Sequence, residues 1–474
     1  MQFNSYLFLF LFLPLSLAGY FGLLHFHRKW ASKVFLIAMS LLFYGFGNPQ
    51  SVLLLIGSAA FNWLFSALLL KRKNKALLAI GIAANVGLLF YFKYFDFFLG
   101  NLLALFHREA TFAQLMLPVG ISFFTFQQIA WLVDSYREET KGYRLVDYLL
   151  FTVYFPKITM GPILLHGEFI PQLQDETKDR LNAKNLSAGL MMLAVGLFKK
   201  VILAELFSTA VAWGFPNPGG LSCTEALLVM LAYTFQLYFD FSGYCDMAMG
   251  ISQMFNLTLP LNFNSPYKAA SITDFWNRWH MTLTRFLRRY IYFPLGGNRK
   301  GTLRTYVNIV IVFLVSGLWH GANWTFLLWG LVHGLAQVFT RIFRKQWERL
   351  HPAFQWICTF GFVNLAWILF RADSMSHFKT FLVHIAQVGN QAIGPNFYPV
   401  FIKPEMPMWM LNHMDLTVFF IYAGALFLVM NPQNCGEEGR NLRPTLLRGL
   451  ATAIMLVWSI LSLAGVSSFI YFQF

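Results

Sequence analysis

Charged residues are scarce in this sequence: Asp, Glu, Lys and Arg make up 12% of 474 residues, whereas a soluble domain carries about a quarter. Apolar runs of about 20 residues, long enough to cross ~30 Å of hydrocarbon, recur from end to end. The low charge excludes an ordinary soluble protein. It predicts an all-α, polytopic membrane protein with about 11–12 membrane segments, some of them short or re-entrant.

Two further scarcities narrow the function. The four cysteines have no paired spacing, which argues against a zinc site and against a disulfide framework. Acidic residues are few, so the net charge is +15. The basic residues cluster between apolar runs, as cytoplasmic loops do, and the excess therefore indicates a membrane topology and not nucleic-acid binding.

The basic loops order the membrane segments. Residues 5–24 lead to Arg28, Lys29 and Lys33, which indicates that the first helix enters from outside. The last segment, 449–468, leaves a basic loop, so both termini are expected outside the cytoplasm. Prolines at 156 and 162 interrupt residues 148–165 and favour a re-entrant element. We expect one membrane domain over 1–474, with N-terminal helices in 1–133, a core in about 148–343, and C-terminal helices with an outer tail in 353–474.

Two histidines lie in aromatic surroundings, His280 in Trp276-Asn277-Arg278-Trp279-His280 and His320 in Gly317-Leu318-Trp319-His320-Gly321. Residues 274–292 predict a helix too polar to face lipid. Basic residues flank the pair of apolar runs 305–318 and 324–340 on both sides. The first run climbs only about 21 Å at 1.5 Å per residue, so the sequence predicts that His320 lies at the tip of a hairpin within the membrane.

An imidazole at that depth is costly and indicates function. The structural alternative is a histidine that hydrogen-bonds a neighbouring helix, and we prefer that role for His333. The simplest chemistry is a general base that takes a proton from an attacking hydroxyl. Indoles at 276, 279, 319 and 324 are expected to exclude water, and Asn277 or His280 to donate a hydrogen bond to the oxyanion. No carboxylate or thiol lies close in sequence, so no metal is expected.

These residues resemble the membrane-bound O-acyltransferases. The two histidine motifs are similar to the signature of that family, whose sterol and diacylglycerol branches have asparagine upstream; histidine at 280 resembles the bacterial envelope branch. Three more stretches resemble alginate and peptidoglycan O-acetylation proteins: Leu117–Phe124, Tyr238–Asp246 and Tyr292–Asn298.

The resemblance implies an enzyme of the bacterial inner membrane with a central funnel. Its expected donor is a cytoplasmic thioester, either acetyl-CoA or an acyl carrier protein, and its expected acceptor is an envelope or exported polysaccharide. It also implies that His320 is the catalytic histidine, that membrane lipid surrounds the chain, and that an extracytoplasmic SGNH-hydrolase-like partner completes the transfer. The sequence leaves the polymer open.

The end of the chain adds Phe469-Ile470-Tyr471-Phe472. It resembles the helper peptide of teichoic acid D-alanylation, whose tyrosine carries the acyl group, and thus implies Tyr471 as an acyl relay. The structural alternative is an aromatic belt at the membrane interface. Asp240 and Asp246 lie in an apolar run, and one of them is expected to pair with an arginine of 278–289.

A second function remains open. A transporter of a small acyl or sugar compound could use the histidines as proton relays without covalent chemistry, but such folds have repeated halves, and the sequence has no internal repeat. A structural subunit of an export complex would leave the histidine pair unexplained.

Overall fold

The computed structural model describes residues 1–108, 117–387, 389, 391–403, 406–431, 435–440, 443, 445–464 and 469–470. Within these ranges every regular element is a helix. Among the described residues, six helices are long and apolar enough to cross a membrane: Phe8–His25, Pro49–Lys71, Lys75–Leu105, Cys223–Met254, Thr302–His320 and Pro352–Arg371. Two shorter apolar helices are Met414–Val429 and Leu446–Leu461. The all-helical, multi-pass class predicted from the sequence is confirmed.

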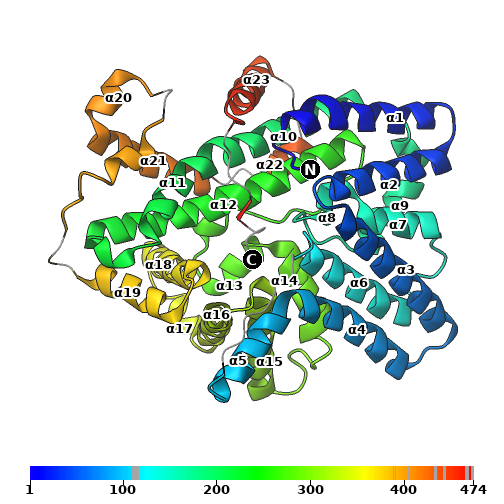
Figure 1. Ribbon diagram of the computed structural model, residues 1–474, viewed down its shortest axis with the longest axis horizontal. Coiled ribbons are helices and arrows are strands. Elements are labelled where there is room, and N and C mark those ends of the chain that lie inside the picture. Colours follow the sequence, from blue (N-terminus) through cyan, green and yellow to red (C-terminus); the bar gives the residue numbers. More distant parts are fainter. Residues whose placement is uncertain are drawn as a thin grey trace. The chain divides into compact units, whose positions relative to one another are not determined.

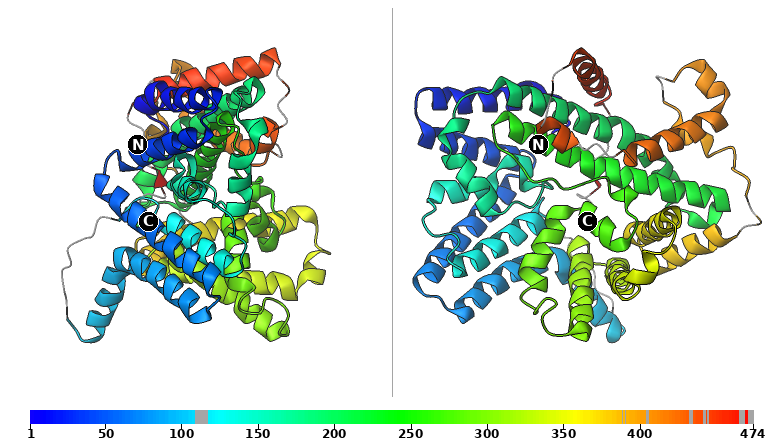
Figure 2. Two further views of the ribbon diagram at one scale, coloured as in Figure 1. Left: turned by 90° about the vertical axis from the view of Figure 1, so that its right-hand side faces the viewer. Right: turned by 180° about the vertical axis from the view of Figure 1, so that it is seen from behind.

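The chain forms two compact units. Unit 1 comprises residues 1–196, 244–261 and 435–463, and unit 2 comprises 197–243, 262–434 and 464–474. The helices of unit 1 (Figures 1 and 2) are η1 Phe8–Phe12, α1 Leu13–His25, α2 Lys29–Gly45, α3 Pro49–Lys71, α4 Lys75–Leu89, η2 Phe90–Tyr94, α5 Phe95–Leu105, α6 Ile121–Tyr136, α7 Leu145–Val153, α8 Phe155–Ile158, α9 His166–Gln174, η3 Glu176–Lys178, α10 Ala183–Leu197, α22 Cys435–Arg440 and α23 Leu446–Leu461.

Local sequence sets the helix ends of unit 1. Asn48 precedes Pro49, and its side chain accepts the Ser51 N–H at 3.3 Å, so α3 begins with a capping residue followed by proline. Pro156 and Pro162 break residues 148–165 into α7, the single turn α8 and a non-helical stretch. The interruption predicted there is confirmed. Apolar side chains of α2, α3, α4, α6, α7 and α8 form one core: Tyr44, Leu55, Leu89, Ile121, Phe124, Val153 and Ile158.

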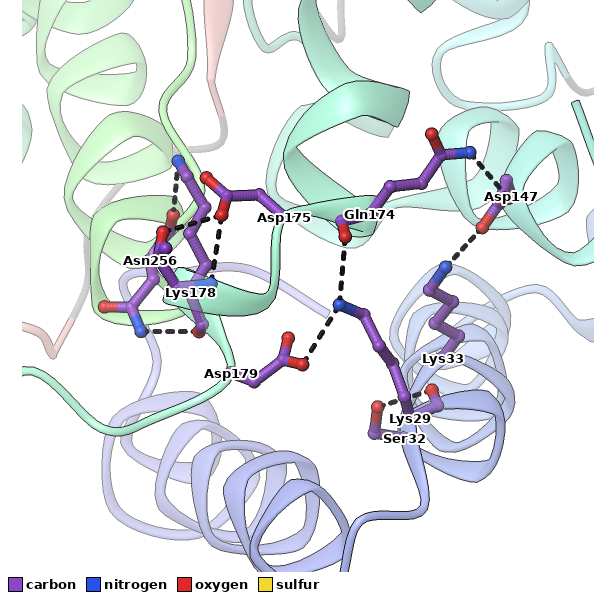
Figure 3. Close-up of polar contacts among 10 residues, drawn as sticks. Lys29, Ser32, Lys33, Asp147, Gln174, Asp175, Lys178, Asp179 and Asn256 are labelled. Atoms are coloured by element: carbon purple, nitrogen blue, oxygen red, sulfur yellow. Dashed lines mark hydrogen bonds and ion pairs between the residues drawn. The ribbon is translucent and has the colours of Figure 1, made fainter.

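Ion pairs fasten the start of α2 to other parts of unit 1 (Figure 3). Lys29 donates to the Gln174 carbonyl at 3.3 Å and pairs with Asp179 at 3.0 Å. One turn later, Lys33 pairs with Asp147 of α7 at 2.6 Å, and the Asp147 carboxylate is buried. The basic residues after the first helix therefore serve as structural partners in addition to marking the loop.

Unit 2 carries both histidine motifs. Its helices are η4 Phe198–Ala204, α11 Glu205–Gly214, η5 Pro218–Gly220, the first part of α12 Cys223–Met254, η6 Pro266–Lys268, α13 Ile272–Arg278, α14 Met281–Leu287, η7 Arg288–Tyr292, α15 Thr302–His320, α16 Trp324–Ile342, α17 Arg344–Trp347, α18 Pro352–Arg371, α19 Met375–Ala386, η8 Tyr398–Phe401, α20 Met408–Asn412 and α21 Met414–Val429. Residues 274–292 do not form the single helix expected, because the chain breaks at Trp279 and His280.

Candidate active site

His320 is the last residue of α15, and α16 begins four residues later. The two helices pack closely because glycines lie where they cross. A Cβ added at Gly317 would lie 2.3 Å from the Phe326 carbonyl oxygen, and one at Gly330 would lie 2.4 Å from the Phe313 carbonyl oxygen. The helical hairpin with His320 at its tip is thus confirmed, and its close crossing needs small residues at both positions.

Aromatic rings surround the His320 imidazole. Its ring centroid lies 4.8 Å from that of Trp319, 5.3 Å from that of Trp329 and 5.0 Å from that of Phe370, all in edge-to-face arrangements. His320 is only 4% exposed. This wall excludes bulk water, and a low local dielectric strengthens every electrostatic interaction of the imidazole.

His280 lies in the turn between α13 and α14, with a left-handed backbone at φ +44°. Asn262 holds this turn. Its side-chain oxygen accepts the Thr282 N–H at 3.2 Å and the Thr282 hydroxyl at 2.8 Å, and lies 3.1 Å from His280 Nδ1. The Asn262 carbonyl also accepts the Met281 N–H at 3.0 Å. One asparagine therefore fixes both the backbone and the ring of His280.

These contacts determine the protonation of His280. A backbone N–H can only donate, so the Asn262 atom facing Thr282 is the oxygen, and the same oxygen requires a proton on His280 Nδ1. Burial lowers the pKa of His280 to about 3, so the ring is neutral at pH 7. Its Nε2 then carries a lone pair, is buried, and has no hydrogen-bond partner among the described residues. It can therefore accept a hydrogen bond from a bound group.

Trp319 brings the two histidines together. Its ring centroid lies 6.1 Å from that of His280 and 4.8 Å from that of His320. The Phe241 ring centroid also lies 4.9 Å from that of His280. Residues 40 apart in sequence thus share one indole, and together they form the candidate active site.

The other predicted aromatic residues lie in different settings. Trp276 donates its N–H to His333 Nδ1 at 3.2 Å, and Trp279 stacks on Phe275 at 5.6 Å. Both indoles are buried in unit 2, and His333 belongs to the same aromatic cluster. Trp324 is 57% exposed. It begins α16, and in this exposure it differs from the buried indoles at 276 and 279.

Asn277 lines a cavity of about 350 Å³ in unit 2 formed by residues of α13, α14, η7, α15 and α16. Arg288 and Arg341 contribute cationic side chains to it, and Ser316 reaches it from α15. Neither histidine lines this cavity, yet Ser316 precedes His320 by one helical turn. Its chemistry, two guanidinium groups beside apolar walls, suits a ligand that is anionic at one end and apolar at the other.

Sequence reasoning missed the partner of Asp240. For this carboxylate the partner is a lysine and not an arginine of 278–289: Lys200 pairs with Asp240 at 2.6 Å, and both side chains are 2% exposed. Two opposite charges in separate apolar runs were a signal for this pair. Asn262 gave no such signal. It lies 18 residues before His280 in the sequence, and only the turn of the chain brings the two side chains into contact.

A group of potential metal ligands lies in unit 1, where donor atoms of Asp134, Glu139 and His166 are within 4.8 Å of one another. His166 Nε2 contacts Asp134 at 3.2 Å, and Arg137 contacts the same carboxylate at 3.5 Å. A guanidinium at this distance opposes a second cation, so the group is better described as an internal polar network.

The sequence profile of the family described as MBOAT, membrane-bound O-acyltransferase, matches residues 63–375. The chain belongs to this family. Both histidines, Asn262 and the Lys200–Asp240 pair lie within the matched residues. Tyr471 lies beyond them and outside the residues that the structure describes.

Individual relatives support the same assignment. The chain is 42% identical to the peptidoglycan O-acetyltransferase of Helicobacter pylori over 407 residues, which cover 79% of this chain and 77% of the relative. It is 35% identical to the probable alginate O-acetylase AlgI of Pseudomonas aeruginosa over 388 residues, which cover 79% of this chain and 73% of the relative. It is 28% identical to the teichoic acid D-alanyltransferase of Bacillus subtilis over 279 residues, which cover 55% of this chain and 70% of the relative. As a membrane-bound O-acyltransferase, the protein is a multi-pass membrane enzyme that transfers an acyl group to a hydroxyl.

Proposed function

We propose that this membrane-bound O-acyltransferase moves an acetyl group from a cytoplasmic thioester to an envelope or exported polysaccharide. The observation that carries the proposal is the pair of buried imidazoles that share Trp319, one of them with a tautomer fixed by Asn262. The relatives named for peptidoglycan and alginate O-acetylation favour acetyl as the group and a glycan as the acceptor.

The proposed donor is acetyl-CoA or an acetylated carrier protein, and the 350 Å³ cavity supports it. Both donors carry phosphate next to a slender pantetheine arm. Arg288 and Arg341 suit the phosphate, and the apolar wall that ends at Ser316 suits the arm. The donor thioester would then approach the hairpin tip from the α15 side, one turn from His320.

In the first proposed step, the Tyr471 phenol attacks the thioester carbonyl. The C–O bond forms while His320 takes the phenolic proton as general base; the C–S bond then breaks, and His320 returns that proton to the departing sulfur, which leaves as the thiol. His280 Nε2 lacks a proton while the ring is neutral, so its supporting role is to accept a hydrogen bond and orient the nucleophile. The aromatic wall protects the thioester from hydrolysis.

In the second step, a serine hydroxyl of an extracytoplasmic SGNH-hydrolase-like partner attacks the ester, the C–O bond to Tyr471 breaks, and the serine proton restores the phenol. The partner then delivers the acyl group to the glycan. Because a phenol has a pKa near 10, an aryl ester is a more reactive donor than an alkyl ester. The proposal includes placement in the bacterial inner membrane, both termini outside the cytoplasm, and one catalytic domain with its core in about 148–343.

The test is acetyl incorporation by full-length His320→Ala at equal protein level in the membrane. Removing a general base should lower transfer by about 10²–10⁴-fold. His384→Ala is the matched control, since His384 is a half-buried histidine of unit 2 whose Nδ1 contacts the Leu221 carbonyl, outside the candidate active site. Substantial residual transfer by His320→Ala would overturn the assignment.

Tyr471→Phe tests the relay separately, because it keeps the aromatic ring and removes only the nucleophilic oxygen. The relay predicts that thiol release and glycan acetylation both stop in this variant. Full glycan acetylation would show that Tyr471 is an aromatic anchor and that the acyl group leaves the histidine site directly.

A further inference from the structure

Lys200 and Asp240 form a buried ion pair in unit 2. Lys200 lies in η4 and Asp240 lies in α12, with 2.6 Å between Nζ and Oδ1. Both side chains are 2% exposed. Removing two charges from water costs free energy that their mutual attraction alone rarely repays, so buried pairs need further hydrogen bonds.

Residues 469 and 470 supply further contacts to this ion pair. Asp240 Oδ2 accepts the Ile470 N–H at 3.0 Å, and Lys200 Nζ lies 4.5 Å from the centroid of the Phe469 ring. Phe469 is 1% exposed and Ile470 is 6% exposed. Each member of the pair thus binds one feature of the segment, the carboxylate a main-chain N–H and the ammonium an aromatic face.

The same turn of α12 also contacts the active site. Asp240 is followed by Phe241, whose ring centroid lies 4.9 Å from that of His280. Successive helical residues point about 100° apart, so Asp240 and Phe241 present adjacent faces of the turn. One face binds Ile470, and the neighbouring face bounds the His280 ring.

We propose that Lys200 and Asp240 form a docking site for residues 469–470 of this chain, and that holding Ile470 there lets the next residue in the sequence, Tyr471, serve the active site of His280 and His320. The presentation rests on the proposed relay, whereas the docking does not. Lys200 and Asp240 are positioning residues, since they act through the segment they bind.

Two double variants test the docking without leaving a lone buried charge. Lys200→Met/Asp240→Asn removes both charges but keeps a side-chain oxygen for the Ile470 N–H. Lys200→Met/Asp240→Leu removes the charges and the acceptor. The measurement is hydrogen–deuterium exchange of the full-length protein, read at the Ile470 amide by mass spectrometry. Lys33→Met/Asp147→Leu, which removes the ion pair of unit 1, is the matched control.

Loss of a hydrogen bond to a charged acceptor should speed exchange at Ile470 by about 10- to 100-fold in the leucine variant. In the asparagine variant, the exchange rate at Ile470 should stay within about threefold of the parent rate. In the unit 1 control, it should equal the parent rate. Equal exchange rates in the two Asp240 variants would overturn the docking. The docking would also be overturned if the unit 1 control exchanged at Ile470 as fast as the leucine variant.

A second substitution approaches the same bond from the segment and does not touch the buried pair. Ile470→Pro has no N–H to donate, whereas Ile470→Val keeps it. We expect the proline variant to lower the kcat of transfer about tenfold with donor KM unchanged, and the valine variant to match the parent. Parental turnover by Ile470→Pro would overturn the presentation of Tyr471.

Failure of the relay is distinguishable from failure of the docking. Tyr471→Phe should leave the exchange rate at Ile470 unchanged, whether or not the phenol carries the acyl group. Protected Ile470 with active Tyr471→Phe would reject the relay and retain the docking site.

Discussion

The Asn262→Asp substitution should give acyl transfer a new dependence on acidic pH. In the parent protein, burial lowers the pKa of His280 to about 3, so this ring stays neutral between pH 5 and pH 9. A carboxylate at position 262 would accept the same three hydrogen bonds from Thr282 and His280, which favour its ionised form. Its negative charge favours the imidazolium, so the pKa of His280 must rise.

The geometry gives the size of the rise. Nδ1 and Oδ1 lie 3.1 Å apart, which puts the two charge centres at about 4 Å; at an effective dielectric of ~20 the attraction is ~4 kcal/mol. At 1.36 kcal/mol per pKa unit this is ~3 units, which moves the pKa of His280 from about 3 to about 6. Near pH 5 about nine rings in ten would then be protonated at Nε2, and transfer should fall about tenfold relative to pH 8.

The assay is the rate of thiol release from acetyl-CoA by the full-length protein between pH 5 and pH 9. Asn262→Leu is the comparison, since it removes the acceptor that fixes the tautomer without adding charge. It should lower the rate by about 10–100-fold at every pH, whereas Asn262→Asp should approach the parent at pH 8. A profile of Asn262→Asp that superimposes on the parent down to pH 5 would refute the proposed use of His280 Nε2.

Three further predictions follow from the site. His280→Ala should lower kcat by at least about tenfold with little change in donor KM, because its contact strengthens as the nucleophile attacks; a change in KM alone would make it a binding residue. Gly317→Ala should destabilise the hairpin by about 1–3 kcal/mol and lower its thermal midpoint, since the new Cβ meets the Phe326 carbonyl, whereas Gly361→Ala meets nothing within 4 Å and should not. Arg288→Gln/Arg341→Gln should raise the KM for acetyl-CoA but not for a small neutral acetyl thioester, and equal effects on both donors would place the phosphate elsewhere.

Much of the fold was predictable because membrane helices can be recognised in a sequence by their length and low charge. The hairpin around His320 followed from two apolar runs with basic flanks, and α15 and α16 confirm it. The single helix over 274–292 was wrong because helical periodicity reports which residues are apolar and not where a backbone turns. A histidine in the left-handed region and a distant asparagine decide the break, and neither leaves a periodic signal.

Within the site, the two histidines and Trp319 were predictable from local motifs, because chemistry-bearing residues are unusual in apolar runs. Their partners were not. Asn262 reaches His280 across a turn, and Lys200 reaches Asp240 between two elements. Such pairs depend on the three-dimensional path of the chain, and a single sequence does not encode that path in any local pattern.

The left-handed backbone of His280 limits what can replace it. At φ +44°, most side chains crowd the following carbonyl at a cost of roughly 1–2 kcal/mol, and asparagine, aspartate and histidine tolerate this region best. The backbone conformation at position 280 therefore restricts which residues can occupy it, whatever their chemical role. Of the residues that pass, only histidine and asparagine are uncharged near neutrality and offer both a donor and an acceptor. A single bend in the main chain would thus make these two residues natural alternatives, so an enzyme could exchange one for the other without rebuilding the turn.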